Sequence, residues 1–131
     1  MKKTPLLHSA LSHAIACLGH GDMIVIADAG LPVPGGTPCI DLAVSRGVPG
    51  FMQVLAAVLS EMQVERSVVA RELRARSPTM HAQIVATFPG STPEEIAHEQ
   101  FKALTRNARA VVRTGEFTPY ANIVLVAGVV F

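Results

Sequence analysis

Residues 23–32 read MIVIADAGLP: five apolar residues, three of them β-branched, which give way to an aspartate, a glycine and a proline. A short β-branched apolar run bounded by turn residues is typical of a buried strand. We therefore predict a strand over Met23–Ala27, followed by a loop over 28–38 that is rich in glycine and proline.

The chain around this strand alternates between helical and extended patterns. Leu11, Ile15 and Leu18 recur at helical spacing; we expect Ser9 to be the N-cap of this helix and Gly19 to end it. Strands that alternate with helices indicate one α/β domain over 1–131, a three-layer α/β/α arrangement with a mostly parallel mixed sheet. The other predicted helices cover 51–62, 79–88 and 95–104. The other predicted strands cover 40–44, 67–70 (within the stretch 64–70), 110–113 and 122–126.

The chain is rich in apolar residues and poor in charge. Hydrophobic residues make up 50% of the 131 positions and charged residues 16%, against a typical charged share of about 25%. Because a domain this small has a large surface to cover, we expect part of that surface to be buried against other subunits in a homo-oligomer. The net charge of +1, without runs of like charge, argues against a nucleic-acid partner.

The cysteines and the N-terminal residues indicate a cytoplasmic protein. Cys17 and Cys39 form no CxxC pair and lack zinc-type spacing, so we expect them to be reduced packing residues. Lys2 and Lys3 precede apolar residues as in a signal peptide, but polar residues at 8, 9, 12 and 13 interrupt the apolar segment. The longest apolar run, 123–131, falls short of the ~20 residues that span a bilayer, which predicts no membrane partner.

Polar residues cluster where the predicted strands meet loops. Ligands of open α/β sheets bind beyond the carboxyl ends of strands, and we expect the clusters to lie at that edge. The clusters are GHGD at 19–22, DAGLP at 28–32 and RTGEFTPYAN at 113–122, with His98-Glu99 near a helix start as a fourth candidate. Together they favour a polar pocket for a small ligand.

Each candidate also has a purely structural explanation. His20 could cap the preceding helix, Asp28 could cap a turn, and His98 could be a solvated residue on a helix face. Arg113 and Glu116 could form a surface ion pair that holds the loop.

Motifs of several common enzyme classes are absent. Neither GxGxxG nor GxxxxGK[ST] occurs, which argues against a nucleotide site. His98-Glu99 lacks the second histidine of HExxH, and there is no GxSxG elbow, which argues against a zinc protease and a serine hydrolase.

At these positions the chain resembles the D-ribose pyranase family. The resemblance covers nearly the whole chain and includes LGHGD at 18–22, IVIADAGLPVP at 24–34, FMQVL at 51–55, RTGE at 113–116 and TPYAN at 118–122. The related fucose mutarotases share the Gly-His-Gly-Asp and Thr-Gly-Glu segments. They carry Asp-Ala-His-Phe-Pro and Lys-Tyr-Gly-Asn where this chain has DAGLP and PYAN, so both differences favour the ribose family.

The resemblance implies that His20 is the catalytic proton donor of an enzyme that needs no metal or organic cofactor. It also implies a ring-shaped homo-oligomer, commonly a decamer of two pentamers. His8 stands where the family has an asparagine, Phe117 stands where it has a small residue, and 91–95 looks like a helix start where the family has a strand. The residues that the resemblance places against the sugar are Asp28, His98, Tyr120, Ala121 and Asn122.

The implied reaction interconverts β-D-ribopyranose and β-D-ribofuranose by acid–base ring opening and reclosure. A histidine suits this reaction, because its ordinary pKa of about 6.5 lets it give and take protons near neutral pH. We expect His20 to be the general acid/base, while Asp28 orients the sugar hydroxyls or the imidazole. The alternatives are a mutarotase for another sugar such as fucose, a non-catalytic sugar-binding accessory protein, and a metal site made of His20, Asp28 and His98.

Overall fold

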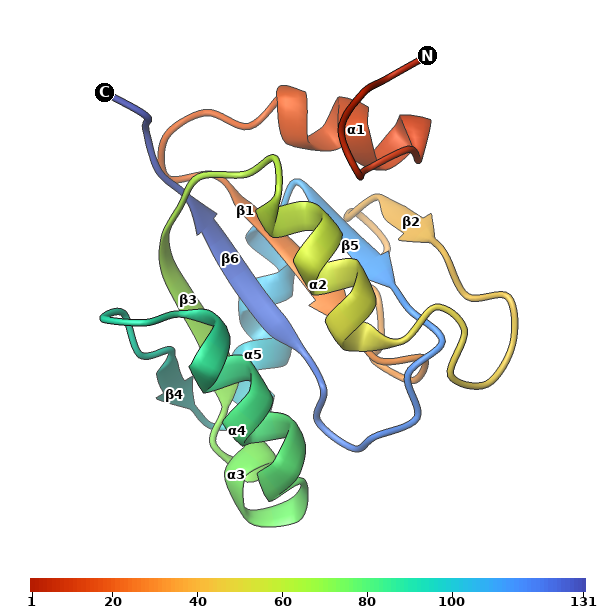
Figure 1. Ribbon diagram of the computed structural model, residues 1–131. Helices are drawn as coiled ribbons and strands as arrows, with labels where there is room; N and C mark the ends of the chain where they lie inside the picture. The colour runs from red at the N-terminus through yellow and green to blue at the C-terminus, as the bar shows by residue number, and fades with distance from the viewer.

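The computed structural model describes residues 1–131. Its strands are β1 (Met23–Ala27), β2 (Cys39–Asp41), β3 (Val64–Ala70), β4 (Glu94–Ile96), β5 (Ala110–Arg113) and β6 (Ile123–Ala127). They form one six-stranded sheet in the order β2–β5–β1–β6–β3–β4 (Figure 1). The helices are α1 (Ser9–Ala16), α2 (Phe51–Leu59), α3 (Glu72–Arg76), α4 (Pro78–Thr87) and α5 (His98–Leu104), with a 3₁₀ turn at Thr105–Asn107.

Strand β6 is the one strand that runs against its neighbours. It pairs antiparallel with β1 and with β3, whereas β1 with β5, β2 with β5, and β3 with β4 are parallel. The predicted mostly parallel mixed sheet is therefore confirmed. One consequence matters for the site: the carboxyl ends of β1, β3 and β5 lie at one edge of the sheet, and their amino ends lie at the opposite edge.

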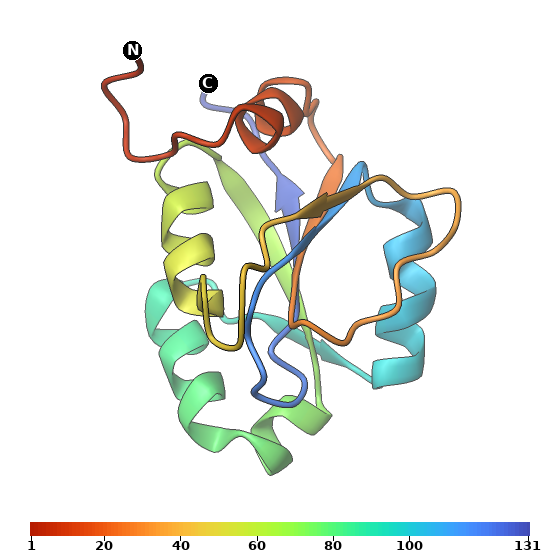
Figure 2. The ribbon, with the colours of Figure 1, turned by 90° about the vertical axis from the view of Figure 1, so that its right-hand side faces the viewer.

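Alternate side chains of the central strands pack into two separate cores. Ile24 and Ile26 of β1 belong to a core that contains residues of α1, α2 and α4, whereas Val25 and Ala27 belong to a core with Phe101 of α5. Figure 2 shows α2 and α4 on one face of the sheet and α5 on the other. A strand that is covered on both faces needs a continuous apolar run, and the predicted three-layer α/β/α arrangement is confirmed.

The first helix has a different cap from the predicted one. His8, not Ser9, is the N-cap, and its Nδ1 accepts a hydrogen bond from the backbone N–H of Leu11 at 3.2 Å. The prediction of Ser9 was wrong because an unprotonated imidazole nitrogen can serve as the acceptor at this position. Asparagine is a preferred N-cap residue, so His8 can do here what the family's asparagine would do.

The predicted helix over 95–104 was wrong at its start. Glu94–Ile96 is strand β4, which pairs with β3 at the sheet edge, and α5 begins only at His98. Glu95 is held by Arg74 and, at 3.2 Å, by His81, and the partly buried Ile96 packs against the core that contains α5. This pairing outweighs the local helical pattern, and the strand that the family resemblance implied is confirmed. The helix predicted over 51–62 likewise ends earlier, at Leu59.

Both cysteines differ from expectation in their location. Cys17 and Cys39 are free and exposed, so the prediction that they are packing residues was wrong. Among the helices, none combines the length and the apolar character that a membrane span requires.

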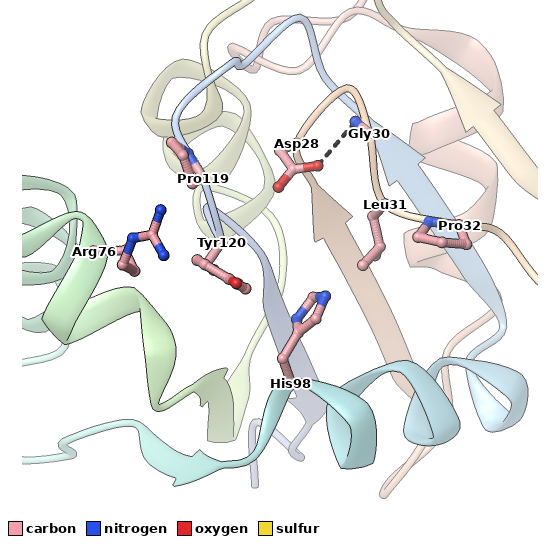
Figure 3. Close-up of a pocket in the computed structure, with 8 residues that line it drawn as sticks. All are labelled: Asp28, Gly30, Leu31, Pro32, Arg76, His98, Pro119 and Tyr120. Atoms are coloured by element: carbon pink, nitrogen blue, oxygen red, sulfur yellow. Dashed lines mark hydrogen bonds between the residues drawn. The ribbon is translucent and has the colours of Figure 1, made fainter.

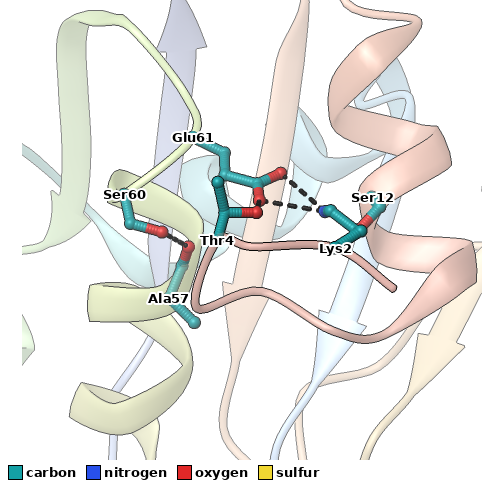
Figure 4. A network of polar contacts seen from close by, with 6 residues as sticks. All are labelled: Lys2, Thr4, Ser12, Ala57, Ser60 and Glu61. Carbon is teal, nitrogen blue, oxygen red and sulfur yellow. Dashed lines mark hydrogen bonds and ion pairs between the residues drawn. The ribbon is translucent and has the colours of Figure 1, made fainter.

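A polar network ties the N-terminal segment to α1 and α2. Lys2 donates to Ser12 of α1 at 2.7 Å and to Glu61, just beyond α2, at 2.9 Å (Figure 4). Thr4 also donates to Glu61, at 2.5 Å. The hydrogen bond from Thr4, followed by that from Lys2, lowers the pKa of the Glu61 carboxyl below its ordinary value of 4.5.

Replacing this carboxylate should make the thermal stability less dependent on pH. Because the folded-state pKa of Glu61 is lowered, its contribution is present above about pH 4.5 and is lost as the pH falls through the folded-state value. Glu61→Gln is expected to lower the melting temperature at neutral pH, with a difference from wild type that shrinks in acid. Melting curves over this pH range check the prediction, and equal midpoints at neutral pH would contradict it.

Candidate functional site

A polar hollow of about 310 Å³ lies at the carboxyl edge of the sheet. Its walls come from the loop after β1, from the end of α3, from the first residue of α5 and from the loop before β6 (Figure 3). Small-molecule pockets begin at about this volume. The residues that line it are Asp28, Gly30, Leu31, Pro32, Arg76, His98, Pro119 and Tyr120.

Asp28 is held in place by Asn122. The Asn122 Oδ1 accepts the backbone N–H of Asp28 at 2.8 Å, and its Nδ2 donates to the Asp28 Oδ2 at 3.0 Å. Asp28 Oδ1 accepts the backbone N–H of Gly30 at 2.9 Å, which closes the turn after β1. Since carboxylate oxygens have further lone pairs, Asp28 can still accept hydrogen bonds from hydroxyl groups in the hollow.

Ala121 and Asn122 lie beneath the hollow rather than along its wall. Both residues are 0% exposed, because β6 begins directly after them in the middle of the sheet. In this structure the contact that the Asn122 side chain makes is with Asp28.

His98 stands at the first position of α5 and presents its ring to the hollow (Figure 3). Both carboxylate oxygens of Glu72 accept the backbone N–H of His98, at 3.2 and 3.0 Å. The imidazole meets the Tyr120 ring edge-on, with 4.9 Å between centroids. His98 Nδ1 is buried and has no hydrogen-bond partner, and a buried polar atom of this kind is costly unless a ligand or water satisfies it.

The Glu72 carboxylate that anchors His98 is ionised over a wide pH range. Burial raises the pKa of Glu72, but hydrogen bonds from the backbone N–H groups of Glu72 and His98 outweigh it, and the net pKa is lowered. The negative charge therefore stays at the start of α5, where the helix dipole favours it.

Tyr120 adopts a backbone conformation that is rare for its residue type. Its φ is +62°, in the left-handed region, which costs about 1–2 kcal/mol for a residue with a side chain. The loop that holds it is tied to α4 by the Ser77 hydroxyl, which donates to the carbonyl of Pro119 at 2.9 Å. Strained residues of this kind cluster at functional sites.

Arg76 is a lining residue that sequence reasoning missed. It ends α3 and extends its guanidinium toward Tyr120 at the rim of the hollow (Figure 3). Its neighbour Arg74 is engaged by Glu95, whereas Arg76 forms no ion pair. The charged stretch of 71–76 was visible in the sequence, but nothing in its spacing showed which arginine would face the site.

His20 lies at the other edge of the sheet, so the expectation that all the polar clusters share one edge was wrong. The turn of 19–22 precedes β1, and its Gly21 donates to the carbonyl of Ala127, the last residue of antiparallel β6, at 2.8 Å. Five residues of β1 at roughly 3.3 Å each place about 17 Å between this turn and Asp28. The nearest polar partner of His20 is Glu65, whose Oε2 lies 2.7 Å from His20 Nε2.

This separation bears directly on the metal alternative. His20 does not join Asp28 and His98 within one chain, and no group of three or more His, Cys, Asp or Glu side chains is arranged to hold a metal ion.

The loop after β5 is fixed by contacts of Arg113 and Glu116 with neighbouring segments. Arg113 is paired with Asp41 at 2.6 Å rather than with Glu116. Glu116 accepts the backbone N–H of Phe51 at 3.1 Å and the hydroxyl of Thr118 at 2.9 Å. Burial raises the pKa of Glu116, but these hydrogen bonds outweigh it and lower the net pKa. Both residues thus hold the loop, through partners that the sequence did not show.

Removing the Asn122 amide is expected to weaken ligand binding in the hollow more than it alters the turnover of a substrate bound there. Asn122→Ala leaves the backbone N–H of Asp28 without its partner, which should cost about 1–3 kcal/mol of stability. It also frees the Asp28 carboxylate to rotate, so KM is expected to rise about 10-fold, equivalent to roughly 1.4 kcal/mol. Kinetics and denaturant unfolding check both effects. Asn107→Ala, at the chain's other asparagine, which is exposed, is the matched control, and equal KM values for the two variants would contradict the assignment.

Comparison with known proteins points to one family. The family model described as "RbsD / FucU transport protein family" matches residues 1–130. Proteins named D-ribose pyranase from Chloroflexus aggregans and Paracidovorax citrulli are 57% and 60% identical over 131 residues, covering 100% of both chains in each case. The structure of Bacillus subtilis RbsD complexed with D-ribose superposes with a TM-score of 0.96 at 48% identity over the whole of both chains. A fucose mutarotase from Streptococcus pneumoniae in complex with L-fucose has a TM-score of 0.80 at 26% identity, again over both whole chains.

Proposed function

The chain belongs to the RbsD / FucU family, and from this premise we propose that it is a D-ribose pyranase, an isomerase that interconverts β-D-ribopyranose and β-D-ribofuranose. The observation that carries the proposal is the hollow at the carboxyl edge of the sheet. There the Asp28 carboxylate, fixed by Asn122, lines the same hollow of about 310 Å³ as His98 and Tyr120. Identity of 55–60% to proteins named for ribose, against 26% to the fucose enzyme, favours ribose as the substrate.

Ring exchange requires only proton transfers. In the opening step the bond between C1 and the ring oxygen breaks, its electron pair goes to the ring oxygen, and an acid protonates that oxygen. The anomeric hydroxyl loses its proton to water and becomes the carbonyl oxygen of the aldehyde. Reclosure adds a different hydroxyl to C1, returns that hydroxyl's proton to the catalytic group and takes one proton from water for the carbonyl oxygen, so that no net proton is consumed.

His20 is the general acid/base in this proposal, and it acts on a hollow of another copy of the chain. Its place at the amino edge of the sheet keeps it out of the hollow of its own chain. Apolar side chains on the segment after β6 support a contact between copies: Val130 and Phe131, three and four residues past the end of β6, are 86% and 101% exposed. An assembly that covers these side chains would also account for the low charge of the chain, and we propose the decamer of two pentamers for it.

The remaining groups bind and orient the sugar. Asp28 accepts hydrogen bonds from sugar hydroxyls, and His98 and Tyr120 supply directional polar contacts from the opposite wall. Ala121 and Asn122 are buried beneath these groups, and Asn122 acts on the sugar through its hydrogen bonds to Asp28. The reaction as written uses no metal or organic cofactor, and we propose that it takes place in the cytoplasm.

NMR exchange spectra of D-ribose with and without the protein test this function. The protein is expected to transfer saturation between the anomeric signals of the β-pyranose and β-furanose forms faster than water alone does. The same experiment with L-fucose is the control for substrate class. Acceleration for fucose but not ribose would identify a mutarotase for the other sugar, and acceleration for neither would leave a non-catalytic sugar-binding protein.

A further inference from the structure

We infer that Glu65 is a positioning residue for His20, and that it leaves Nδ1 as the ring nitrogen that exchanges protons with the sugar. The inference deepens the proposed function and rests on it, because it concerns how the acid/base is presented. Within one chain the group that faces the imidazole is Glu65 and not Asp28, which lies at the opposite edge of the sheet.

The contact itself assigns different tasks to the two ring nitrogens. His20 Nε2 lies 2.7 Å from Glu65 Oε2, and an ionised carboxylate can only accept a hydrogen bond. Nε2 must therefore carry a proton whether the ring is neutral or charged. Nδ1 makes no hydrogen bond within the chain, so it is the nitrogen that can give a proton to the sugar ring oxygen and take one back on reclosure.

The backbone of β3 is deformed at the residue that makes this contact. The pairing of β3 with β6 shifts register between Val64 and Arg66, so Glu65 sits at a β-bulge. Bulges re-aim a side chain relative to the regular alternation of a strand and occur next to active sites. The other half-exposed carboxylate near this strand, Glu94, pairs with Arg66 across a regular part of the sheet edge at 3.5 Å.

The C-terminal segment is shaped to fit against Glu65. A Cβ on Gly128 would lie 3.0 Å from the Glu65 Cβ and 3.3 Å from its backbone nitrogen. Gly128 also donates its N–H to the carbonyl of Gln63 at 2.9 Å. Gly128 thus packs closely against the residue that holds His20.

The turn that carries His20 is equally restrained. Asp22 Oδ2 accepts the backbone N–H of Gly19 at 2.8 Å, and Asp22 Oδ1 is paired with Arg109 at 3.0 Å. Gly21 has a φ of +81°, which a residue with a side chain rarely adopts. With the turn and the bulge both held, the imidazole and the carboxylate are presented to a neighbouring copy as one preorganised pair.

Removal of the carboxylate should lower turnover without weakening sugar binding. In Glu65→Ala, kcat for ribose ring exchange is expected to fall about 10-fold. This is less than the 10²–10⁴-fold that a positioned acid/base supplies, because the imidazole remains and both side chains are about half exposed. KM should remain at its wild-type value, since the sugar contacts lie in the hollow. Glu65→Gln, whose amide oxygen can still accept from Nε2, should recover part of the lost kcat.

The control is Glu94→Ala, which removes the ion pair with Arg66 at similar exposure and should leave kcat unchanged. Long-range ¹H–¹⁵N NMR of the wild type should show His20 protonated at Nε2 when neutral, and Glu65→Ala should weaken that preference. Wild-type kcat in Glu65→Ala, or an equal loss in Glu94→Ala, would overturn the inference. If the wild type does not accelerate ring exchange, the proposed function fails, and the NMR spectra still report whether Glu65 holds the ring.

Discussion

His20→Ala is expected to reduce the acceleration of ribose ring exchange by 10²–10⁴-fold, the usual contribution of a positioned acid/base. The loss should fall on kcat, because the hollow that binds the sugar lies at the opposite edge of the sheet and keeps its walls. Saturation-transfer NMR with D-ribose measures the rate directly. His13→Ala, at an exposed histidine of α1, is the matched control and should retain full activity.

Mixing two inactive variants separates the location of His20 from its chemistry. If His20 serves the hollow of another copy, an oligomer reassembled from His20→Ala and Asp28→Asn subunits contains some sites with both residues intact. Such mixtures should regain part of the activity that each variant lacks alone. A His20→Ala variant with wild-type rates would remove His20 from the mechanism, and mixed oligomers without any recovery would contradict the shared site.

Gly115→Ala is expected to destabilise the fold by about 3 kcal/mol, at the upper end of the usual cost of overpacking. A Cβ at this position would lie 2.5 Å from the Ser45 carbonyl oxygen and 2.6 Å from that of Val48. These are backbone atoms of a turn that accepts and donates hydrogen bonds with the 113–118 loop, so neither can move without breaking that contact.

The consequence should reach the site, because the same loop carries Glu116, whose backbone carbonyl accepts the N–H of Ala29 beside Asp28 at 2.9 Å. Denaturant unfolding checks the stability loss and ribose exchange checks the activity. Gly35→Ala, in the loop after β1, meets no atom within 4 Å and should be nearly neutral. Equal unfolding midpoints for Gly115→Ala and Gly35→Ala would show that the 113–118 loop can move to accommodate the added Cβ.

Much of the architecture could be predicted from local sequence, for physical reasons that are local as well. The β-branched run of Met23–Ala27 disfavours a helix and needs cover on both faces, which already indicates a central strand of a layered α/β domain. Turn residues after β1 likewise mark the loop that ends in the hollow. Candidate polar residues stood out because carboxylate, imidazole and phenol groups follow the predicted strands, where ligands of open α/β sheets bind.

Other features depended on partners far away in the sequence. Glu94–Ile96 became a strand because β3 offered a free edge, and His8 became the cap of α1 because its ring could reach the Leu11 N–H. The same holds for Asn122, whose amide is turned toward Asp28, a residue 94 positions away.

The sequence by itself therefore determined most of the candidate residues, because residue type sets what a side chain can donate or accept. Only the tertiary structure decided at which edge of the sheet each of these residues lies. The strand between His20 and Asp28 has to cross the sheet, so the proposed acid/base and the hollow proposed for the sugar lie at opposite edges. The bulge in β3 then brings Glu65 to His20, and the end of α3 brings Arg76 to the hollow, through distances that no local pattern encodes.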